Sequence, residues 1–414
     1  MPLAVSVLAL ASPPGEGVRA GIMGMIGRST PVVLGPVVAS YLTSGSAPVG
    51  GLIVPAFEVV APAQVGLNPK NLERAEAAVS TDVRRGLIPG AALVVGRGAE
   101  VVEKKGIGRL GSGLAEVDPD STIYDLASLT KVVATTSAIM LLVEEGKVEL
   151  DAPVQRYLPE FQGGLKNRVT VRQLLTHTSG LPAGASPPKG TPDETLKRLI
   201  ATPLKTKPGE RMVYSDLGPI ILFAVAERVA GEAVPVMLER RVFAPLGMTS
   251  TKFGQLDACD ACAPTTSGTR GLVHDPLARR LGGVAGNAGL FSTASDIGRF
   301  AAMMAGGGAL GEVRIFREET VREFTARQKG AGDRALGWVT PGTRRATGSE
   351  GERISDSAFG HTGFTGTSLW IDPERGTWAV LLSNRTYIAG APNRMQALRR
   401  TINNLVSAAV DAGS

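Results

Sequence analysis

The chain has 414 residues, of which 43% are hydrophobic and 20% are charged. These are ordinary values for a soluble globular protein, and the length is sufficient for two structural units. The net charge is +6, but the basic residues are scattered as pairs and aromatic residues make up only 5%, which argues against the basic, aromatic-lined face of a nucleic-acid binder.

Residues 1–65 are rich in Gly, Pro, Ala and Val and carry almost no charge. No uninterrupted apolar span reaches the roughly 18 to 20 residues that a membrane-spanning helix needs, so we predict no integral membrane segment. The stretch from Met25, MIGRSTPVVLGPVVASYLTSGSA, is similar to a signal peptide, although its Pro and Gly weaken the match. We expect a leader here, either the signal peptide of a periplasmic or secreted protein or a flexible segment of a cytoplasmic one.

The segment after the leader predicts a helix and then a pair of strands. Asn68 and Pro69 are typical of a helix start, and Gly86 ends the apolar pattern that follows them. Residues 90–108, GAALVVGRGAEVVEKKGIG, indicate two strands joined by a tight turn that contains Gly.

From residue 128 to about 330 the pattern is mostly helical, and the clearest helices are expected over 128–145, 217–230 and 236–245. Strand signals return in SLWIDPERGTWAVLLSNR, with a turn at Asp372-Pro373, and an amphipathic helix is expected from about Pro392 to Val410. Strands at both ends predict one antiparallel α/β domain built from residues 66–127 and 335–414. The mainly helical residues 128–334 are then a domain inserted into it.

The inserted part begins with a serine and a lysine three positions apart, Ser128 and Lys131, at the head of a long apolar run. On a helix these positions share one face, and the helix start offers free N–H groups that stabilise an oxyanion. Burial against the apolar helix makes the neutral form of Lys131 more accessible. A lysine in that state takes the proton of a serine hydroxyl, which makes Ser128 a candidate nucleophile.

The spacing alone is weak evidence, because a serine at a helix start followed by a surface lysine fits it equally well. A second pair with the same spacing, Ser186 and Lys189, has two prolines between its members. These prolines prevent the helical turn that brings the two side chains together, so only the first pair remains a candidate.

Two later segments add partners for this pair. Tyr214 and Asp216 precede the helix expected over 217–230, and His361, Thr362 and Gly363 enter the last predicted hairpin. A tyrosine beside a lysine serves as a proton acceptor, and a Gly-bearing strand lets a substrate approach the backbone.

The three elements stand in the order of the S-x-x-K, Y-x-N and K-T-G motifs, so the chain resembles the serine β-lactamases and penicillin-binding proteins. Further segments resemble the class C branch: LLTHTSGLP (174–182), PLGMTSTKF (245–253) and AGLFSTASDIGRF (288–300). That branch includes class C β-lactamases, DD-peptidases and family VIII carboxylesterases. The resemblance covers roughly residues 66 to 410 and implies the class C β-lactamase-like α/β (α+β) fold, an antiparallel sheet flanked by terminal helices plus an inserted all-α domain.

The resemblance also implies roles for single residues. Ser128 is expected to be acylated, with Lys131 and Tyr214 as proton-transfer partners. The N–H groups of Ser128 and Phe364 are expected to form the oxyanion hole. No G-x-S-x-G elbow occurs in the chain, which argues against the α/β-hydrolase route to the same reaction.

Two substrate-binding positions depart from the family pattern. Asp216 stands where the family has an asparagine amide, and an ionised carboxylate accepts hydrogen bonds only. It pairs with Lys131 or caps the helix over 217–230, and both alternatives remain open. His361 replaces a lysine, and a neutral imidazole anchors a substrate carboxylate less well than an ammonium. Together the two changes favour neutral ester substrates.

Other candidate residues rank lower. Asn287 is a possible substrate contact and His274 a loop residue near the cleft, whereas His177 and Trp338 are more typical of packed structural residues. Cys259 and Cys262 form one CxxC without further ligands, so two loop thiols or a local disulfide are expected. We expect no metal and no cofactor.

The predicted function is therefore that of a serine hydrolase working through a covalent acyl-enzyme. A carboxylesterase for small acyl esters with weak β-lactam hydrolysis is the leading hypothesis. A D-Ala-D-Ala carboxypeptidase or class C-like β-lactamase, acting on a peptide or β-lactam substrate, is the alternative within the same chemistry. The alternative outside enzymes is a non-catalytic penicillin- or peptidoglycan-binding protein. The sequence does not indicate the oligomeric state.

Overall fold

The computed structural model describes residues 57–187, 189–266, 269–342 and 348–411. Its centre is a five-stranded antiparallel sheet in the order β2-β1-β10-β9-β8. The strands are β1 Gly90–Arg97, β2 Glu100–Gly108, β8 Phe359–Thr362, β9 Ser368–Asp372 and β10 Thr377–Ser383. The first and last parts of the chain therefore meet in one sheet, because β1 pairs directly with β10. The predicted antiparallel α/β architecture is confirmed.

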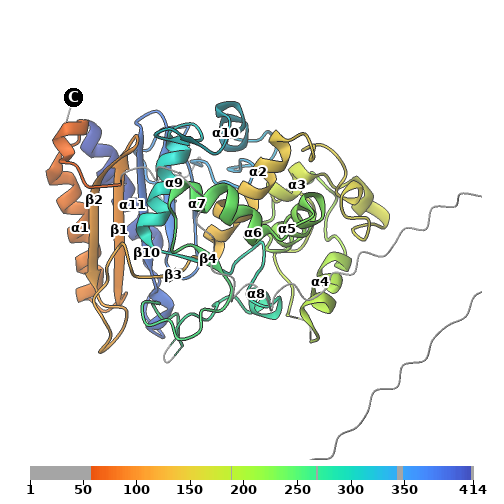
Figure 1. Cartoon of the computed structure of the whole chain (residues 1–414), viewed down its shortest axis with the longest axis horizontal. Helices are drawn as coiled ribbons and strands as arrows, with labels where there is room; N and C mark the ends of the chain where they lie inside the picture. Colours follow the sequence, from red (N-terminus) through yellow and green to blue (C-terminus); the bar gives the residue numbers. More distant parts are fainter. Residues whose placement is uncertain (1–56, 188, 267–268, 343–347, 412–414) are drawn as a thin grey trace, which may run out of the picture.

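Helices cover both faces of the sheet (Figure 1). Helices α1 (Pro69–Arg84) and α11 (Met395–Asp411) pack together on one face, and α9 (Ala294–Ala305) packs on the other. The side chains of β1 alternate between the two faces, since Leu93 belongs to the core under α1 and α11 while Val94 belongs to the core on the α9 side. Asn68 begins α1 as predicted, and its side chain accepts the Lys70 N–H.

The rest of the chain forms a helical part beside the sheet (Figure 1). Its helices are α2 Ser137–Glu144, α3 Val171–Leu175, α4 Pro192–Ala201, α5 Leu217–Ala230, α6 Val234–Leu238, α7 Ala244–Leu246, α8 Pro276–Arg280 and α10 Glu318–Thr325. Short strands complete it: β3 Tyr124–Asp125 and β4 Lys252–Phe253 pair with β5 Leu290–Ser292, and β6 Ala309–Leu310 pairs with β7 Val313–Arg314.

The helix that begins near Ser128 is not uniform. A 3₁₀ turn over Ala127–Leu129 leads into a π-helical turn over Lys131–Thr136, and α2 follows. Among the described residues, the stretch Ala127–Glu144 is the one long and apolar enough to span a membrane, but 83% of it is buried inside the protein. Its apolar character therefore reflects a place in the core.

Several boundaries differ from those expected. Residues 57–65 belong to the body of the fold, since the Phe57 ring stacks on Trp378 and Val59 pairs with Val101. The signal-peptide prediction falls on residues 25–47, outside the described part. The helix expected over 236–245 is divided by a π-helical turn, Glu239–Phe243. Helix α9 lies within the predicted helical insertion, yet packs on the sheet because its apolar face meets β1 and β10.

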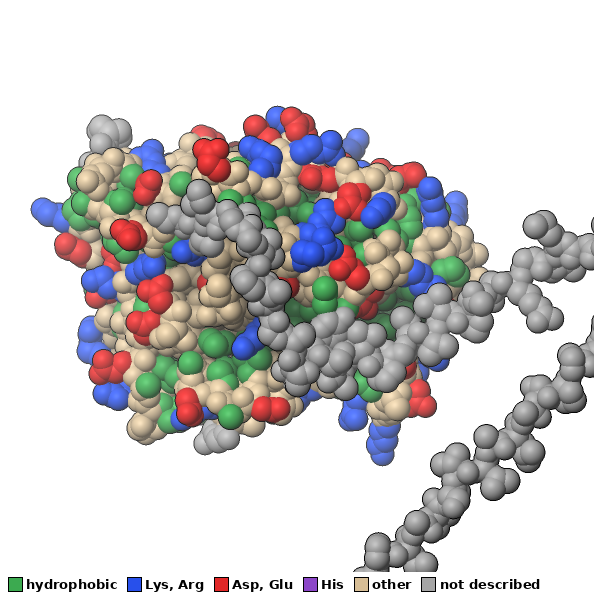
Figure 2. Space-filling model, viewed as in Figure 1, with side chains coloured by type: hydrophobic (Ala, Val, Ile, Leu, Met, Phe, Trp, Pro, Cys, Tyr) green, Lys and Arg blue, Asp and Glu red, His purple; other side chains and the backbone are tan. Residues whose placement is uncertain are grey.

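Charged side chains are distributed as the composition suggests. Figure 2 shows Lys and Arg interspersed with Asp and Glu over the face in view. Of the alternatives for the CxxC segment, the structure has the local disulfide between Cys259 and Cys262.

Candidate functional site

The residue before the candidate nucleophile has an unusual backbone conformation. Ala127 has a φ of 47°, in the left-handed region that non-glycine residues rarely adopt. The Asp125 carboxylate stabilises this turn by accepting the N–H of Ala127 at 2.8 Å and that of His274 at 2.6 Å. Burial raises the pKa of Asp125 to about 6, and the two N–H donors oppose this rise. The turn places Ser128 at the start of the buried helix.

Lys131 connects Ser128 with the second motif. Its Nζ lies 2.8 Å from Ser128 Oγ, 2.8 Å from Asp216 Oδ1 and 3.1 Å from the Asn287 carbonyl oxygen. The side chain is only 2% exposed. An ammonium group has three N–H donors, and each of these three acceptors lies within hydrogen-bond distance of it.

The charge state of Lys131 differs from the sequence-based expectation. Burial does lower its pKa, but the electrostatic interactions and hydrogen bonds with Tyr214 and Asp216 outweigh burial and leave the pKa raised. The expectation of an accessible neutral lysine was wrong because it considered the apolar helix without the facing acidic groups. The facing groups therefore favour the ammonium form of Lys131.

The second motif faces this ammonium. The Tyr214 ring centroid is 5.0 Å from Lys131 Nζ. Asp216 stands at the N-cap position of α5, but its side chain makes no capping hydrogen bond and binds Lys131 instead. Of the two predicted roles for Asp216, the structure therefore has the ion pair.

The third motif lies on the edge strand β8. His361 is 3% exposed, and its Nδ1 is 2.9 Å from the Thr362 carbonyl oxygen. A carbonyl only accepts, so Nδ1 carries the proton and Nε2 presents a bare lone pair, for which no partner is found among the described residues. Burial and the charges of Arg334 and Lys131 hold the pKa of His361 well below 6.5. His361 is a neutral imidazole, as expected.

The turn after this motif is bound to the nucleophile segment. Gly363 allows the close approach, since a Cβ there would lie 2.5 Å from the Leu126 carbonyl oxygen. The hydroxyl of Thr367 donates to the same oxygen at 2.9 Å, and the hydroxyl of Thr365 donates to the Asp125 carbonyl oxygen at 2.8 Å. These threonines fix the distance between the first and third motifs.

Arg399, on α11, supports the turn from the other side. Its Nη2 donates to the carbonyl oxygens of Gly363 at 2.9 Å and Thr367 at 2.8 Å. Burial, with repulsion from Arg385, lowers the pKa of this guanidinium to about 9. Sequence reasoning missed Arg399 and the two threonines, because the motif ends at Gly363 and α11 carries no motif.

The predicted oxyanion hole combines the N–H groups of Ser128 and Phe364. Within the described residues, neither N–H has a protein acceptor in the hydrogen-bond network. The Phe364 side chain is 61% exposed and lies between the His274 ring, with centroids 5.4 Å apart, and the Arg385 guanidinium, 4.5 Å from the ring centroid. Phe364 therefore combines a free N–H with an exposed ring at the edge of the site.

The lower-ranked candidates have mainly structural surroundings. Asn287 was expected to touch substrate, but it is 1% exposed, its carbonyl oxygen accepts from Lys131, and its Nδ2 donates to Asp275 Oδ1. Its contact with the site therefore runs through the backbone. His177 Nδ1 accepts the Ser215 N–H at 3.1 Å, which anchors the second motif, and Trp338 is fully buried.

Arg334 is a site residue that no sequence motif indicated. Its guanidinium carbon is 5.2 Å from the Tyr214 ring centroid, and the side chain is 11% exposed. Its Nε and Nη1 are buried without a hydrogen-bond partner among the described residues. The Asp333 carboxylate lies 3.5 Å from Nε, a contact too long for a good hydrogen bond. A second cation thus lies beside the three motifs.

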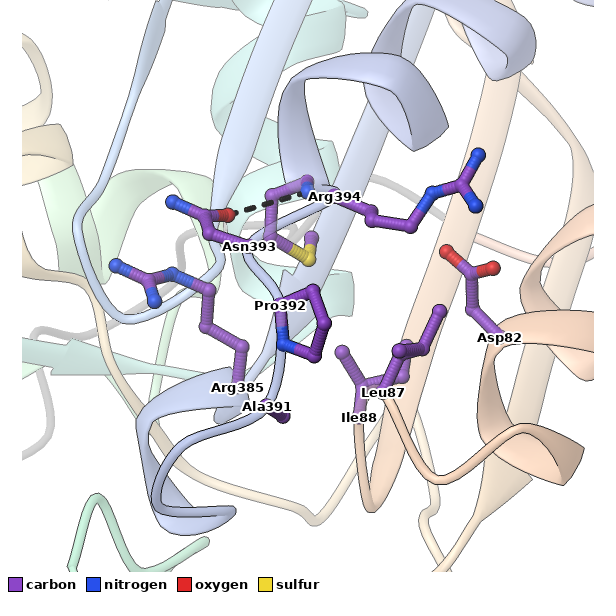
Figure 3. Close-up of a pocket in the computed structure, with 9 residues that line it drawn as sticks. Asp82, Leu87, Ile88, Arg385, Ala391, Pro392, Asn393 and Arg394 are labelled. Atoms are coloured by element: carbon purple, nitrogen blue, oxygen red, sulfur yellow. Dashed lines mark hydrogen bonds between the residues drawn. The ribbon is translucent and has the colours of Figure 1, made fainter.

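The small pocket in Figure 3 is a different place. It is lined by the end of α1, the approach to β1 and the start of α11, and contains none of the three motifs. Arg385 is its one link to the site edge, and in Figure 3 the guanidinium groups of Arg385 and Arg394 point in different directions. The residues that line this pocket do not surround the candidate nucleophile or its partners.

Comparisons with known proteins identify the family of the chain. The family model described as "Beta-lactamase" matches residues 75–402. A protein of Escherichia coli K12 named "Putative D-alanyl-D-alanine carboxypeptidase" is 32% identical over 376 residues, which cover 80% of this chain and 86% of that one.

Two solved structures share the fold. A penicillin-binding protein homolog from Caulobacter crescentus has a TM-score of 0.66 at 22% identity, covering 82% of this chain and 98% of its own. EstCE1, described as a hydrolase with promiscuous acyltransferase activity, has a TM-score of 0.65 at 22% identity, covering 81% and 98%.

Proposed function

The chain belongs to the beta-lactamase family, and among the serine hydrolases of that family we propose that it cleaves small acyl substrates, carboxylic esters first, through an acyl-enzyme on Ser128. The observation that carries the proposal is the contact of Lys131 Nζ with Ser128 Oγ at 2.8 Å, while the same ammonium binds Asp216. A nucleophile held by a positioned partner, itself oriented by a third group, is the general pattern of activated serines.

The proposed reaction keeps Lys131 charged. Ser128 Oγ forms a bond to the substrate carbonyl carbon, and its proton passes to the oxygen of Tyr214, which this step requires as a phenolate. The carbonyl oxygen becomes an oxyanion that accepts from the N–H groups of Ser128 and Phe364. Tyr214 then returns the proton to the leaving oxygen as the C–O bond breaks. A water molecule repeats the sequence to release the acid and restore Ser128.

Ester substrates are favoured by the third motif. A lysine there would offer an ammonium to the substrate, whereas His361 is neutral and its free Nε2 only accepts. Breaking the C–O bond of an ester also requires less activation of the leaving group than breaking the C–N bond of an amide. One proton-transfer partner, Tyr214, therefore suffices for an ester.

A D-Ala-D-Ala carboxypeptidase is the second candidate. It is favoured by Arg334, a cation beside Tyr214 that offers what the neutral His361 lacks. The curated relatives of Escherichia coli and Salmonella carry names of that activity.

Three assays run in parallel test the proposal: short-chain p-nitrophenyl esters, a chromogenic cephalosporin and an acyl-D-Ala-D-Ala peptide. Ester turnover well above the other two supports an esterase, and peptide turnover above ester turnover favours the second candidate. Absence of all three, with no acylation of Ser128 by mass spectrometry, would contradict both.

The Asp216–Lys131 pair predicts a change in pH dependence. Asp216→Asn removes a negative charge that raises the pKa of Lys131, so this pKa should fall. Because the proposed reaction needs Lys131 protonated, the basic limb of the kcat/KM profile should move to lower pH. Asp216→Glu, which keeps the carboxylate, is the control and should leave the limb near its wild-type position. A basic limb that stays in place in Asp216→Asn would show that Asp216 does not set the charge of Lys131.

A further inference from the structure

The carboxylate of Asp125 connects the segment of the nucleophile to the loop of His274. The Asp125 side chain is 2% exposed. Its Oδ1 accepts the Ala127 N–H at 2.8 Å, and its Oδ2 accepts the His274 N–H at 2.6 Å. Each carboxylate oxygen therefore faces a backbone donor of a different segment. The Asp125 carbonyl oxygen accepts from the Thr365 hydroxyl, so the third motif is fixed to the same residue.

This arrangement suits the ionised form of Asp125. A carboxylate has acceptors only, whereas a carboxylic acid carries an O–H and an asparagine amide carries an NH₂ group. Both carboxylate oxygens are already directed at N–H groups. Protonation or amidation therefore turns one acceptor into a donor that faces another donor, and one of the two hydrogen bonds is weakened or lost.

The turn that Asp125 holds is strained. Ala127 has a φ of 47°, which is unfavourable for any residue with a Cβ. Ser128 follows directly, and its Oγ lies 2.8 Å from Lys131 Nζ. When the hydrogen bond to the Ala127 N–H is lost, nothing in the Asp125 side chain opposes relaxation of the turn. Ser128 then moves away from its partner, and a displacement of about 1 Å costs on the order of 10²-fold in rate.

We propose that Asp125 is a positioning residue that must be ionised for Ser128 to act, so that protonation of this carboxylate releases the turn and lowers activity. The proposal rests on the acyl-enzyme function above and adds to it a residue that precedes the first motif. Asp125 touches no reacting atom and acts through the backbone of Ala127.

The charge of Asp125 also has a cost for folding. Burial is the main cause that raises its pKa from 3.8 to about 6; Asp275 adds to the rise, and Arg279 and the two N–H donors oppose it. The folded protein therefore binds this proton more tightly than the unfolded chain does. The stability that the proton adds is lost as the pH rises through about 6, so the charged form is the less stable one at neutral pH. Groups with such perturbed pKa values are common at functional sites.

The test compares the wild-type protein with Asp125→Asn at two pH values, with a short-chain p-nitrophenyl ester as substrate. At about pH 8 the wild-type carboxylate is charged, and its kcat/KM should exceed that of the variant by ~10²-fold. At about pH 4.5 Asp125 is mostly protonated, and the ratio should fall below about tenfold. The pH dependence of Lys131 and Tyr214 is common to both proteins and cancels in the ratio. A ratio that is the same at both pH values, or a fully active variant at about pH 8, would overturn the proposal.

Asp372→Asn is the matched control. Asp372 ends β9 and is also 2% exposed, and its Oδ2 and Oδ1 accept the N–H groups of Ser355 at 2.9 Å and Arg375 at 3.2 Å. It repeats the hydrogen bonding of Asp125 at a place that contains none of the three motifs. Its replacement should leave kcat/KM near the wild-type value at both pH values. The melting temperature of each variant checks the fold.

A second substitution tests the link to the strained turn. Glycine adopts a positive φ without steric cost, so Ala127→Gly should stabilise the turn without the help of the carboxylate. Added to Asp125→Asn, it should recover about tenfold in kcat/KM at about pH 8, because the penalty for the left-handed conformation is removed. No recovery in a double variant that folds would show that Asp125 does not act through Ala127.

Crystal structures of the wild-type protein at about pH 8 and about pH 4.5 separate this proposal from the proposed function, since they need no substrate. At about pH 8 Ser128 Oγ should lie 2.8 Å from Lys131 Nζ, as here, and at about pH 4.5 the turn should be relaxed and this distance longer. Such a change supports the role of Asp125 even if none of the esters is hydrolysed. An unchanged turn at about pH 4.5 overturns it, whatever the rates of hydrolysis.

Discussion

Replacing Ser128 by alanine is expected to abolish turnover of every substrate of this protein, a loss of roughly 10⁴–10⁶ in kcat, as for other nucleophile deletions. The fold should remain, because within the described part of the chain the Ser128 hydroxyl has one hydrogen bond, from Lys131. The Lys131 side chain keeps Asp216 and the Asn287 carbonyl oxygen as acceptors. Ester hydrolysis and mass spectrometry of the acylated protein measure the loss of activity, and circular dichroism measures the fold.

Ser186→Ala is the matched control for this variant. Ser186 is exposed and is also followed by a lysine three positions later, so it repeats the spacing without the site. Its replacement should leave activity at the wild-type level. Full ester hydrolysis by Ser128→Ala would remove Ser128 as nucleophile, and the acyl-enzyme mechanism with it.

Tyr214→Phe is expected to lower the rate of acylation by ~10²–10⁴, the usual contribution of a positioned general acid or base. The ring should keep its packing, since its neighbours are the rings of His177 at 4.7 Å and His361 at 6.0 Å between centroids. Only the oxygen that takes and returns the proton is removed. Burst-phase kinetics with a p-nitrophenyl ester separate acylation from hydrolysis of the acyl-enzyme.

Tyr157→Phe serves as a control for the loss of a phenolic oxygen. The Tyr157 hydroxyl accepts the Glu149 N–H at 2.8 Å outside the motifs, so its removal should cost about 1 kcal/mol of stability and leave acylation unchanged. If Tyr214→Phe acylates within threefold of the wild type, Lys131 and its carboxylate partner must move the proton without Tyr214.

Local features of the fold were predictable from the sequence because short-range chemistry specifies them. The cap of α1 by Asn68 depends on one side chain and the N–H two residues later. The hairpin of β9 and β10 depends on alternating apolar residues and a turn with Pro. The three motifs were also visible, since each is a short run of residues whose order is preserved along the chain.

The charges of the site were not predictable in the same way. Lys131 meets Asp216 and Arg334 meets Tyr214 only because distant segments fold against each other. The expected neutral lysine was wrong because burial and an opposing carboxylate act on the pKa in opposite directions, and their balance depends on distance.

The pairing of β1 with β10 also constrains how the protein acquires its structure. Ser383 Oγ donates to the Gly90 carbonyl oxygen across 293 positions of the chain, so the centre of the sheet is a contact of very high sequence separation. Folding that depends on such contacts is slow, because the loop between them must close before the contact forms. During synthesis β1 and β2 leave the ribosome long before their partner exists, which exposes an unpaired strand edge prone to aggregation. A nascent chain stopped before residue 377 lacks the strand that joins both ends, so assembly of the sheet must await release of nearly the whole polypeptide.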